Sequence, residues 1–156
     1  MSRSSMMRLL PLTLAATLAL HPALALGCGP TPPAFDGDPA SGVSVSVGRI
    51  TDRTWEPVLV DGVAVPEEAG LSLTVSFEGA VEGTTGCNRF TGRADLDAGW
   101  MQLGPLAVTE MACLDPERME RETAWLKALA EARGFVVSPD GLWLTREDGS
   151  VAVCLG

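Results

Sequence analysis

Apolar and polar residues alternate through most of the chain from residue 43 onward, a pattern typical of β-strands that bury one face. The clearest run is LSLTVSFE at residues 71–78, which places Phe77 on the apolar face with the three aliphatic residues before it. Turn-forming residues separate the runs, and Asp97-Ala98-Gly99 is typical of a hairpin turn. The pattern predicts strands over residues 43–50, 54–60, 71–78, 92–96, 100–104 and 106–111.

One amphipathic helix is predicted to follow residue 115. Asp115 is placed to cap it, Pro116 suits its first position, and Gly134 follows its last turn. Its apolar face consists of Met119, Trp125, Leu126, Leu129 and Ala130. Three more strands are predicted at residues 135–138, 142–146 and 151–155. The order predicts an α+β domain in which a curved, mainly antiparallel sheet packs against one amphipathic helix.

The first 27 residues have the pattern of a secretory signal peptide. Residues 1–8 contain two arginines and no acidic residue, and residues 9–20 form an apolar run of 12. A helix that spans a bilayer needs about 20 apolar residues, so this run is too short for a membrane anchor. Residues 28–42 are rich in Pro, Gly, Ala and Asp, which predicts a flexible tether before a folded domain at residues 43–156.

Two cleavage sites fit the leader, and they predict different locations. Residues 24–28, LALGC, resemble a bacterial lipobox, which would make Cys28 the first mature residue and the site of lipidation. Ordinary signal-peptidase cleavage after Ala25 also fits, because small residues precede the cut. The sequence therefore predicts export to the bacterial cell envelope, either lipid-anchored facing the periplasm or as a soluble periplasmic or secreted protein.

The chain is acidic, with 20 Asp and Glu against 11 Lys and Arg and a formal charge of −9, which argues against a nucleic acid partner. Without residues 1–27, 9 basic and 20 acidic residues would remain, a charge of −11. This charge favours a cationic partner or serves only solubility, and both interpretations stay open. His21, the single histidine, lies in the leader, so we expect no Ser-His-Asp catalysis and no His-ligated metal in the mature protein. The sequence predicts no catalytic residue and no cofactor.

Four cysteines occur, and in an exported protein they are expected to pair. The preferred pairing, Cys87 with Cys113, would close a loop of about 26 residues and stabilise the fold by roughly 2–4 kcal/mol. Cys154 is the alternative partner for either of them. If Cys28 carries a lipid, three thiols remain and one stays unpaired within the molecule, whereas an unmodified Cys28 allows two bridges.

Two segments carry a resemblance to a known family. GCNRFTG at residues 86–92 is followed about 20 residues later by TEMAC at residues 109–113. Together with Trp55 in an early strand, these motifs resemble the META-domain family, also called HslJ-like, over about residues 50–155. The resemblance implies an open or distorted β-barrel with one helix. It also implies a small bacterial envelope protein, many of which carry a lipobox, and it supplies no catalytic mechanism.

One position departs from the family pattern. The family usually has Arg where this chain has Glu110, and we hypothesise that Arg89 and Glu110 form an ion pair. Reversal of that charge, Glu110→Arg, would then lower the melting temperature. The Gly, Asn and Cys residues of the motif favour a structural role. If the motif instead binds a partner, the candidate patch is Asn88, Arg89, Thr109, Glu110 and Met111.

The resemblance implies a non-catalytic envelope module that supports stress tolerance or the assembly of envelope components. Its partner would be an envelope protein or an apolar ligand, and it would contact the membrane only through a lipid on Cys28. The alternative is an acidic inhibitor of a cationic hydrolase such as a lysozyme, which the charge, the small size and the cysteines also suit.

Overall fold

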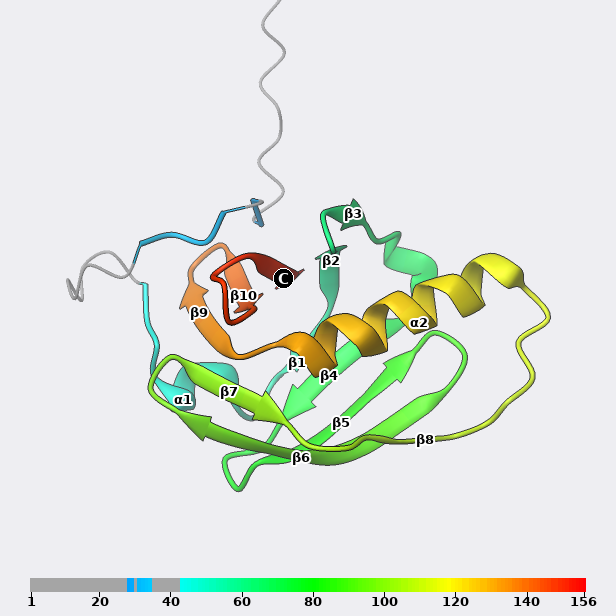
Figure 1. Ribbon diagram of the computed structural model, residues 1–156, viewed down its shortest axis with the longest axis horizontal. Helices are drawn as coiled ribbons and strands as arrows, with labels where there is room; N and C mark the ends of the chain where they lie inside the picture. The colour runs from blue at the N-terminus through cyan, green and yellow to red at the C-terminus, as the bar shows by residue number, and fades with distance from the viewer. Residues whose placement is uncertain (1–27, 30, 35–42) are drawn as a thin grey trace, which may run out of the picture.

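The computed structural model describes residues 28–29, 31–34 and 43–156. The predicted signal peptide, residues 1–27, lies outside the described residues, as do residues 30 and 35–42 of the predicted tether. From Val43 onward the strands form a curled sheet around one long helix (Figure 1). This is the α+β architecture that the sequence predicted.

The sheet is antiparallel throughout the described chain. Its strands follow the order β1-β4-β5-β6-β7-β9-β10-β11-β2-β3, and β8 pairs with β6 beside this path. The strands are β1 (Thr54–Trp55), β2 (Pro57–Val60), β3 (Val63–Ala64), β4 (Leu71–Val75), β5 (Ala80–Thr85), β6 (Arg89–Asp97), β7 (Trp100–Leu103), β8 (Ala107–Val108), β9 (Gly134–Ser138), β10 (Gly141–Thr145) and β11 (Val151–Leu155). The helices are α1 (Val47–Ile50), the 3-10 turn η2 (Glu67–Ala69) and α2 (Pro116–Glu131).

Residues 54–60 form one bent strand that closes the curl. Its first half, β1, pairs with β4, and its second half, β2, pairs with β11. Between them the Glu56 N–H donates to the Gly156 carbonyl oxygen (3.3 Å), and the Gly156 N–H donates to that of Glu56 (2.9 Å). Across the barrel, β7 and β9 meet through one register pair of described residues, Trp100 and Gly134. The sheet is therefore a distorted barrel, closed at Glu56 and splayed where β7 meets β9.

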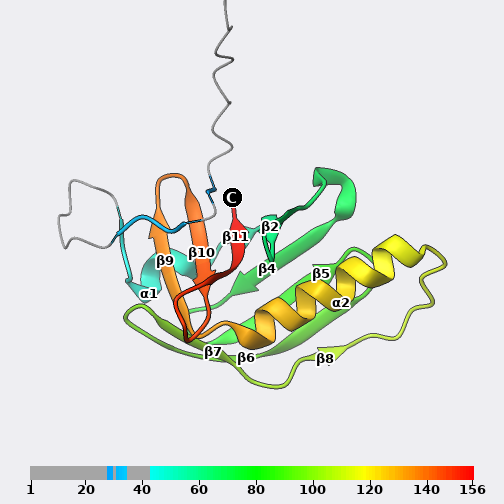
Figure 2. The same cartoon turned by 45° about the horizontal axis from the view of Figure 1, so that its top comes forward.

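Helix α2 lies along the concave side of the sheet (Figure 2). It begins as the sequence predicted, because an Asp115 side-chain oxygen accepts a hydrogen bond from the Glu117 N–H at 3.0 Å. Trp125, Ala128 and Leu129 are buried on its inner face. The largest side chains that fill the interior beside them are Trp55, Phe90, Phe135, Ile50, Leu73, Met101 and Leu142. These residues pack together in one hydrophobic cluster between the helix and the sheet.

Three of the predicted strands differ from the structure. Residues 43–50 are not a strand: Ser44 makes one bridge to Val137, and the chain then coils into α1, which places Ile50 in the core. The strand predicted to include Phe77 ends at Val75, because residues 76–79 form a turn, and Phe77 is 68% exposed. The strand predicted over 106–111 is reduced to β8, since the chain beyond it turns toward the β5–β6 turn.

The end of α2 is tied to two turns by Arg146. Its Nε donates to the Glu131 carboxylate on α2 at 2.8 Å, its Nη2 donates to Asp61 in the β2–β3 turn, and its Nη1 donates to the Val151 carbonyl at 3.1 Å. The hydrogen bond to Glu131 raises the pKa of Arg146, and the bond to Asp61 adds to the effect. Because the pKa is raised, the stability that these ion pairs add is lost only as the pH rises through the pKa of Arg146. Their contribution to the free energy of unfolding is therefore constant between about pH 6 and 9.

We expect Arg146→Met to lower the free energy of unfolding by about 1–2 kcal/mol, a value reduced because both acidic partners are more than a third exposed. Lys127→Met is the matched control, because Lys127 pairs with the same Glu131 at 3.8 Å but is 65% exposed, and it should cost less than about 0.5 kcal/mol. Urea unfolding at pH 6 and pH 9 measures both variants. Equal losses of unfolding free energy in the two variants would show that Arg146 contributes no more than an ordinary surface ion pair.

Candidate functional site

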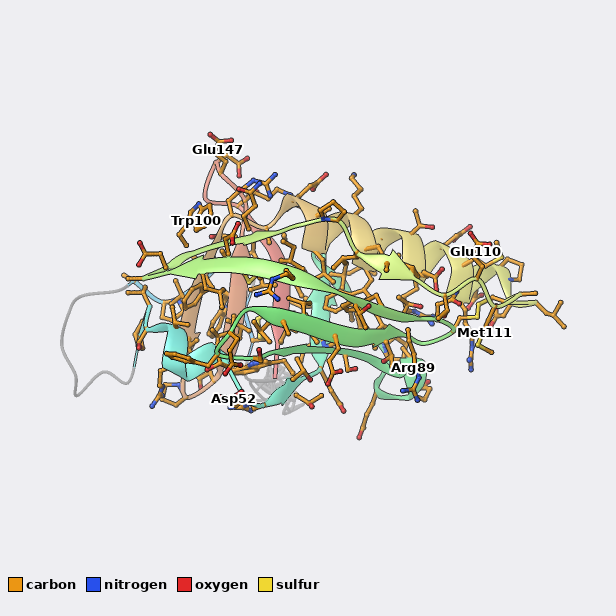
Figure 3. All side chains as sticks on the ribbon, turned by 90° about the horizontal axis from the view of Figure 1, so that it is seen from below. Asp52, Arg89, Trp100, Glu110, Met111 and Glu147 are labelled. Carbon is orange, nitrogen blue, oxygen red and sulfur yellow. A yellow bond between two sulfur atoms is a disulfide. The ribbon has the colours of Figure 1, made fainter. Side chains whose placement is uncertain are left out.

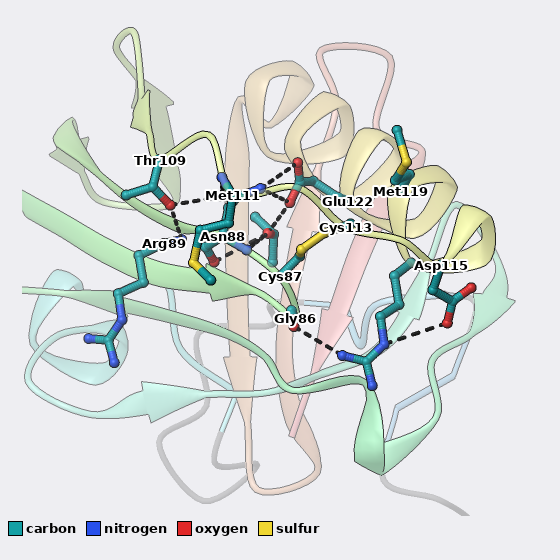
Figure 4. The surroundings of a disulfide bond; sticks show 12 residues. Gly86, Cys87, Asn88, Arg89, Thr109, Met111, Cys113, Asp115, Met119 and Glu122 are labelled. Atoms are coloured by element: carbon teal, nitrogen blue, oxygen red, sulfur yellow. Dashed lines mark hydrogen bonds and ion pairs between the residues drawn. A yellow bond between two sulfur atoms is a disulfide. The ribbon is translucent and has the colours of Figure 1, made fainter.

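The β5–β6 turn, residues 86–88, is the centre of the motif that the sequence analysis singled out. Gly86 has a φ of +82°, and a Cβ there would press on the Ala69 carbonyl oxygen, so neither the conformation nor the space suits another residue. Cys87 is bonded to Cys113 in the segment before α2, with their Cα atoms 6.1 Å apart. This is the pairing expected from the sequence, and it joins the turn to the start of the helix (Figure 4).

Asn88 is buried at the centre of a hydrogen-bond network. Its Oδ1 accepts from the Met111 N–H at 2.7 Å and from the Thr109 hydroxyl at 2.9 Å. Its Nδ2 donates to both carboxylate oxygens of Glu122 on α2, at 3.0 and 3.2 Å. The Thr85 hydroxyl donates to the same carboxylate and accepts from the Asn88 N–H at 2.9 Å. One amide side chain therefore joins a strand turn, a loop and the helix.

Glu122 was not among the residues singled out from the sequence. The signal was present in the helical spacing, because Glu122 precedes buried Trp125 and Leu129 by three and seven residues and so shares their face. An acidic residue on the apolar face of a helix is expected to have a hydrogen-bond partner inside the fold, because removing a charge from water costs free energy unless the charge is paired. That partner is Asn88, 34 residues earlier, which periodicity along one element does not locate.

The structure divides the five residues of the predicted binding patch. Asn88 is buried and all its side-chain atoms are bonded internally, and the Thr109 hydroxyl is engaged with it. Arg89, Glu110 and Met111 are exposed. The motif is therefore structural at its centre and accessible at its margin.

The ion pair hypothesised between Arg89 and Glu110 is wrong. No salt bridge among the described residues joins them, and Figure 3 shows Met111 between their side chains. Arg89 lies on the outer face of β6, whereas Glu110 lies on the loop after β8. We now expect Glu110→Arg to leave the melting temperature within about 2–3 °C of the wild type, since surface changes away from special contacts cost within about 0.5 kcal/mol. A larger drop in a thermal melt would show a contact that the geometry lacks.

Three exposed apolar side chains occur in the segment between β8 and the first turns of α2. Met111 is 66% exposed, Leu114 is 96% exposed, and Met119, which the sequence placed on the buried face, is 54% exposed. We call these three residues the apolar tip. Its backbone is held by the Met111–Asn88 hydrogen bond and the Cys87–Cys113 bridge (Figure 4), and by the Asp115 cap of α2. The tip is therefore a fixed apolar projection.

The second pair of cysteines lies on the outer face of β10 and β11. Trp143 and Cys154 are paired across these strands and both are buried, because Cys28 and Gly29 cover them. Cys28 is bonded to Cys154, with Cα atoms 5.8 Å apart, and the Trp143 indole donates to the Gly29 carbonyl at 3.0 Å. Cys154 thus pairs with neither Cys87 nor Cys113. Lipidation of Cys28 would need the sulfur that forms this bridge, so the predicted lipid anchor and the bridge exclude each other.

Two further properties bear on the site. Within the described ranges, no group of three or more His, Cys, Asp or Glu side chains is arranged to hold a metal ion. None of the helices in the described part of the chain has the length and apolar character needed to span a bilayer.

A curled antiparallel sheet around one helix, with a disulfide-linked turn hydrogen-bonded to that helix, defines a class of small α+β domains. Residues 48–155 match the model of the META domain, so the chain belongs to the META domain family. No curated protein matches the chain.

Two solved NMR structures share the fold. The NMR structure of a protein from Burkholderia xenovorans is 27% identical, with a TM-score of 0.54 over 81% of this chain and 94% of that chain. Another NMR structure is 20% identical, with a TM-score of 0.57 over 71% of this chain and 93% of that one. A crystal structure of a duf4847 family protein from Bacteroides vulgatus is 12% identical, with a TM-score of 0.47 over 70% of this chain and 94% of that one.

Proposed function

We propose that this META-domain protein is a non-catalytic module of the bacterial cell envelope that binds another protein through its apolar tip. The observation that carries the proposal is the exposure of Met111, Leu114 and Met119 on a backbone fixed by a disulfide and a buried amide. Exposed apolar side chains grouped on one segment are typical of interaction surfaces, and Met adapts its shape to a partner. A projecting surface suits a protein partner better than a small apolar ligand, because small ligands bind in concave sites.

The rigidity of the tip supports this role. Binding costs the ordering of loops and side chains, and a loop that is already fixed avoids much of that cost. Asn88 and Glu122 bond each other and so present no free polar group to a ligand. The motif residues therefore serve binding by holding the tip, and the contacts themselves would come from Met111, Leu114 and Met119.

The charge around the tip indicates the chemistry of the partner. The same segment exposes four acidic residues, Glu110, Asp115, Glu117 and Glu120, against the basic Arg118, which pairs with Asp115, and the half-buried Arg121, so the acidic charge predominates. An apolar centre with an acidic rim fits a partner that has an apolar pocket with a basic rim. The formal charge of −9 would steer such a partner from a distance.

We propose that the protein acts outside the cytoplasm, in support of envelope stress tolerance or the assembly of envelope components. The leader at residues 1–27 supports export, and two disulfides suit an oxidising compartment. The bridge between Cys28 and Cys154 supports the proposal of a soluble periplasmic or secreted form over the lipid-anchored one.

Site-specific photocrosslinking in producing cells tests the binding surface. A photoreactive phenylalanine analogue at Leu114 should give a discrete crosslinked species, whereas the same analogue at Phe77 should not. Phe77 is the matched control, because it is 68% exposed and apolar but lies in the β4–β5 turn. Leu114→Asp combined with Met119→Asp should remove a crosslink made from Met111. Equal crosslinking from positions 77 and 114 would contradict a specific tip.

The acidic rim also favours a second candidate, an inhibitor of a cationic hydrolase such as a lysozyme. Stoichiometric protein should then abolish lysis by a basic lysozyme at low salt, where electrostatic steering is strongest. Glu117→Lys with Glu120→Lys should restore lysis. An unchanged lytic rate at low salt would remove this candidate and leave the envelope-partner proposal in place.

A further inference from the structure

Trp100 differs from the other three tryptophans of the chain. Those three are buried, and each indole N–H donates to a backbone carbonyl: Trp55 to Ile50 (2.9 Å), Trp125 to Thr84 (3.2 Å) and Trp143 to Gly29 (3.0 Å). Trp100 is 41% exposed, and its indole N–H makes no hydrogen bond to any residue that the structure describes. Trp100 is therefore the tryptophan whose indole N–H remains available, at the surface, to bond a ligand.

The neighbouring strand leaves space beside this ring. Trp100 is paired with Gly134 on β9, and Gly134 with Thr145 on β10, so the three form one cross-strand row on the same face. A Cβ at Gly134 would lie 2.7 Å from the Thr145 hydroxyl oxygen, with no atom of Trp100 within 4 Å. The ring of Trp100 therefore does not cover this glycine.

A second glycine in the same sheet is covered by the aromatic ring of its cross-strand partner, unlike Gly134. Gly83 is paired with Phe90, whose ring packs on the space that a side chain at Gly83 would occupy. Because Trp100 is not used in this way, its ring borders an open hollow. That hollow has a volume of about 370 Å³, within the range of small-molecule sites, and is lined by Trp100, Arg133, Gly134, Thr145, Arg146 and Glu147.

The polar lining is balanced in charge. Arg146 and Lys127 together neutralise Glu131 and Asp61, which leaves Arg133 and Glu147 as the opposite charges at the rim. Arg133 uses Nη1 for the Ala130 and Ala132 carbonyls, and in the described chain its other two nitrogens have no hydrogen-bond partner. An anion would be repelled by Glu147 and a cation by Arg133. A neutral ligand with both donors and acceptors would satisfy both groups.

We propose that this hollow binds a neutral saccharide. A pyranose ring has an apolar C–H face, which would stack on the Trp100 indole, and hydroxyl groups, which would accept from Arg133 and the indole N–H and donate to Glu147. The hollow lies away from the apolar tip, as Figure 3 shows by the places of Trp100 and Glu147 relative to Met111. The saccharide site is therefore independent of the protein-binding role proposed above.

Nuclear magnetic resonance tests the assignment, because the protein should show four indole N–H signals. Tri-N-acetylchitotriose and maltotriose, each added to the ¹⁵N-labelled protein up to about 10 mM, serve as probes. We expect at least one of them to move the Trp100 indole signal and the Gly134 and Thr145 amide signals saturably. The other three indole signals should stay in place. Saturation by neither sugar, or shifts spread evenly over the protein, would overturn the proposal.

Variants distinguish stacking from a general effect on the fold. Trp100→Ala should weaken saccharide binding by about tenfold or more, and Trp100→Phe should retain part of the affinity. Glu147→Gln should weaken binding less, since an amide still accepts a hydrogen bond. Phe77→Ala is the control, because it removes an exposed aromatic ring elsewhere and should leave binding unchanged. Binding by Trp100→Ala at wild-type affinity, or saturation by the flat nucleoside adenosine without either sugar, would overturn the assignment.

Discussion

Serine at both Cys28 and Cys154 should lower the free energy of unfolding by about 4–5 kcal/mol. The bridge joins residues 126 apart, so its loss frees a long loop in the unfolded chain, and the cost grows with loop length. The cover over Trp143 would also loosen, because Cys28 and Gly29 pack on it. Urea unfolding without reductant measures the loss. The control is the double serine variant at Cys87 and Cys113, a separation of 26, which should cost about 3–3.5 kcal/mol.

The same bridge predicts the chemical state of the mature protein. Intact mass after alkylation should show no free thiol before reduction and four after it, in a soluble species that lacks acyl groups. A membrane-bound species that begins at an acylated Cys28, with one thiol alkylated before reduction, would contradict the bridge. It would also make Trp143 and Cys154 an uncovered apolar face.

Asn88→Ala should cost about 3 kcal/mol of unfolding free energy without a change in the denaturant slope. The substitution removes four part-buried hydrogen bonds, to the Glu122 carboxylate, the Thr109 hydroxyl and the Met111 N–H, and each contributes about 0.5–1.5 kcal/mol. Thr91→Ala, on the exposed face of the same strand, is the control and should cost less than about 0.5 kcal/mol. A loss below about 1 kcal/mol for Asn88→Ala would mean that the network is not a major source of stability.

Asn88→Asp separates hydrogen bonding from packing, because Asp has nearly the shape of Asn. The new carboxylate can still accept from Met111 and Thr109, but it would face the Glu122 carboxylate, which accepts only. Like charges at this distance repel, so this variant should gain stability as the pH falls toward about 4, where one carboxyl group takes up a proton. Glu122→Gln added to Asn88→Asp should remove that pH dependence. Stability that falls with pH in the single variant would show that the two groups do not meet.

The elements that the sequence predicted well carry local signals. Asp115 and Pro116 mark the start of α2 whatever surrounds them, and the turns around Gly141 and Gly149 bound the C-terminal strands. The strand predicted over 43–50 was wrong because the apolar residues alternate there as in a strand, whereas the chain coils into α1 and so places Ile50 in the core. The prediction that Phe77 lies on the buried face was wrong for a related reason. The alternation continues in the sequence as far as Phe77, but a turn ends β4 before it.

The sequence predicted the residues that the turn and the loop contribute to the candidate site, but not the residue that α2 contributes. The motif placed Asn88 beside Thr109 and Met111, because a turn and a loop linked by a disulfide must bring their flanking residues together. Glu122 was missed because its partner comes from another element, and the contact depends on the depth at which α2 packs on the sheet. The pairing of Arg89 with Glu110 failed because complementary charge in a motif says nothing about which face of the sheet each residue occupies.

The bent strand at Glu56 also constrains when the domain can fold. Its hydrogen bonds to Gly156, and those of β2 to β11, join residues about 100 positions apart. A chain that has emerged only as far as β10 would have unpaired strand edges at β2 and β10, so it could not close its sheet. For the export that we propose, this order is useful, because a chain that folds late stays extended enough to be threaded through a translocation channel. Folding would then follow transport, in the compartment where both disulfides can form.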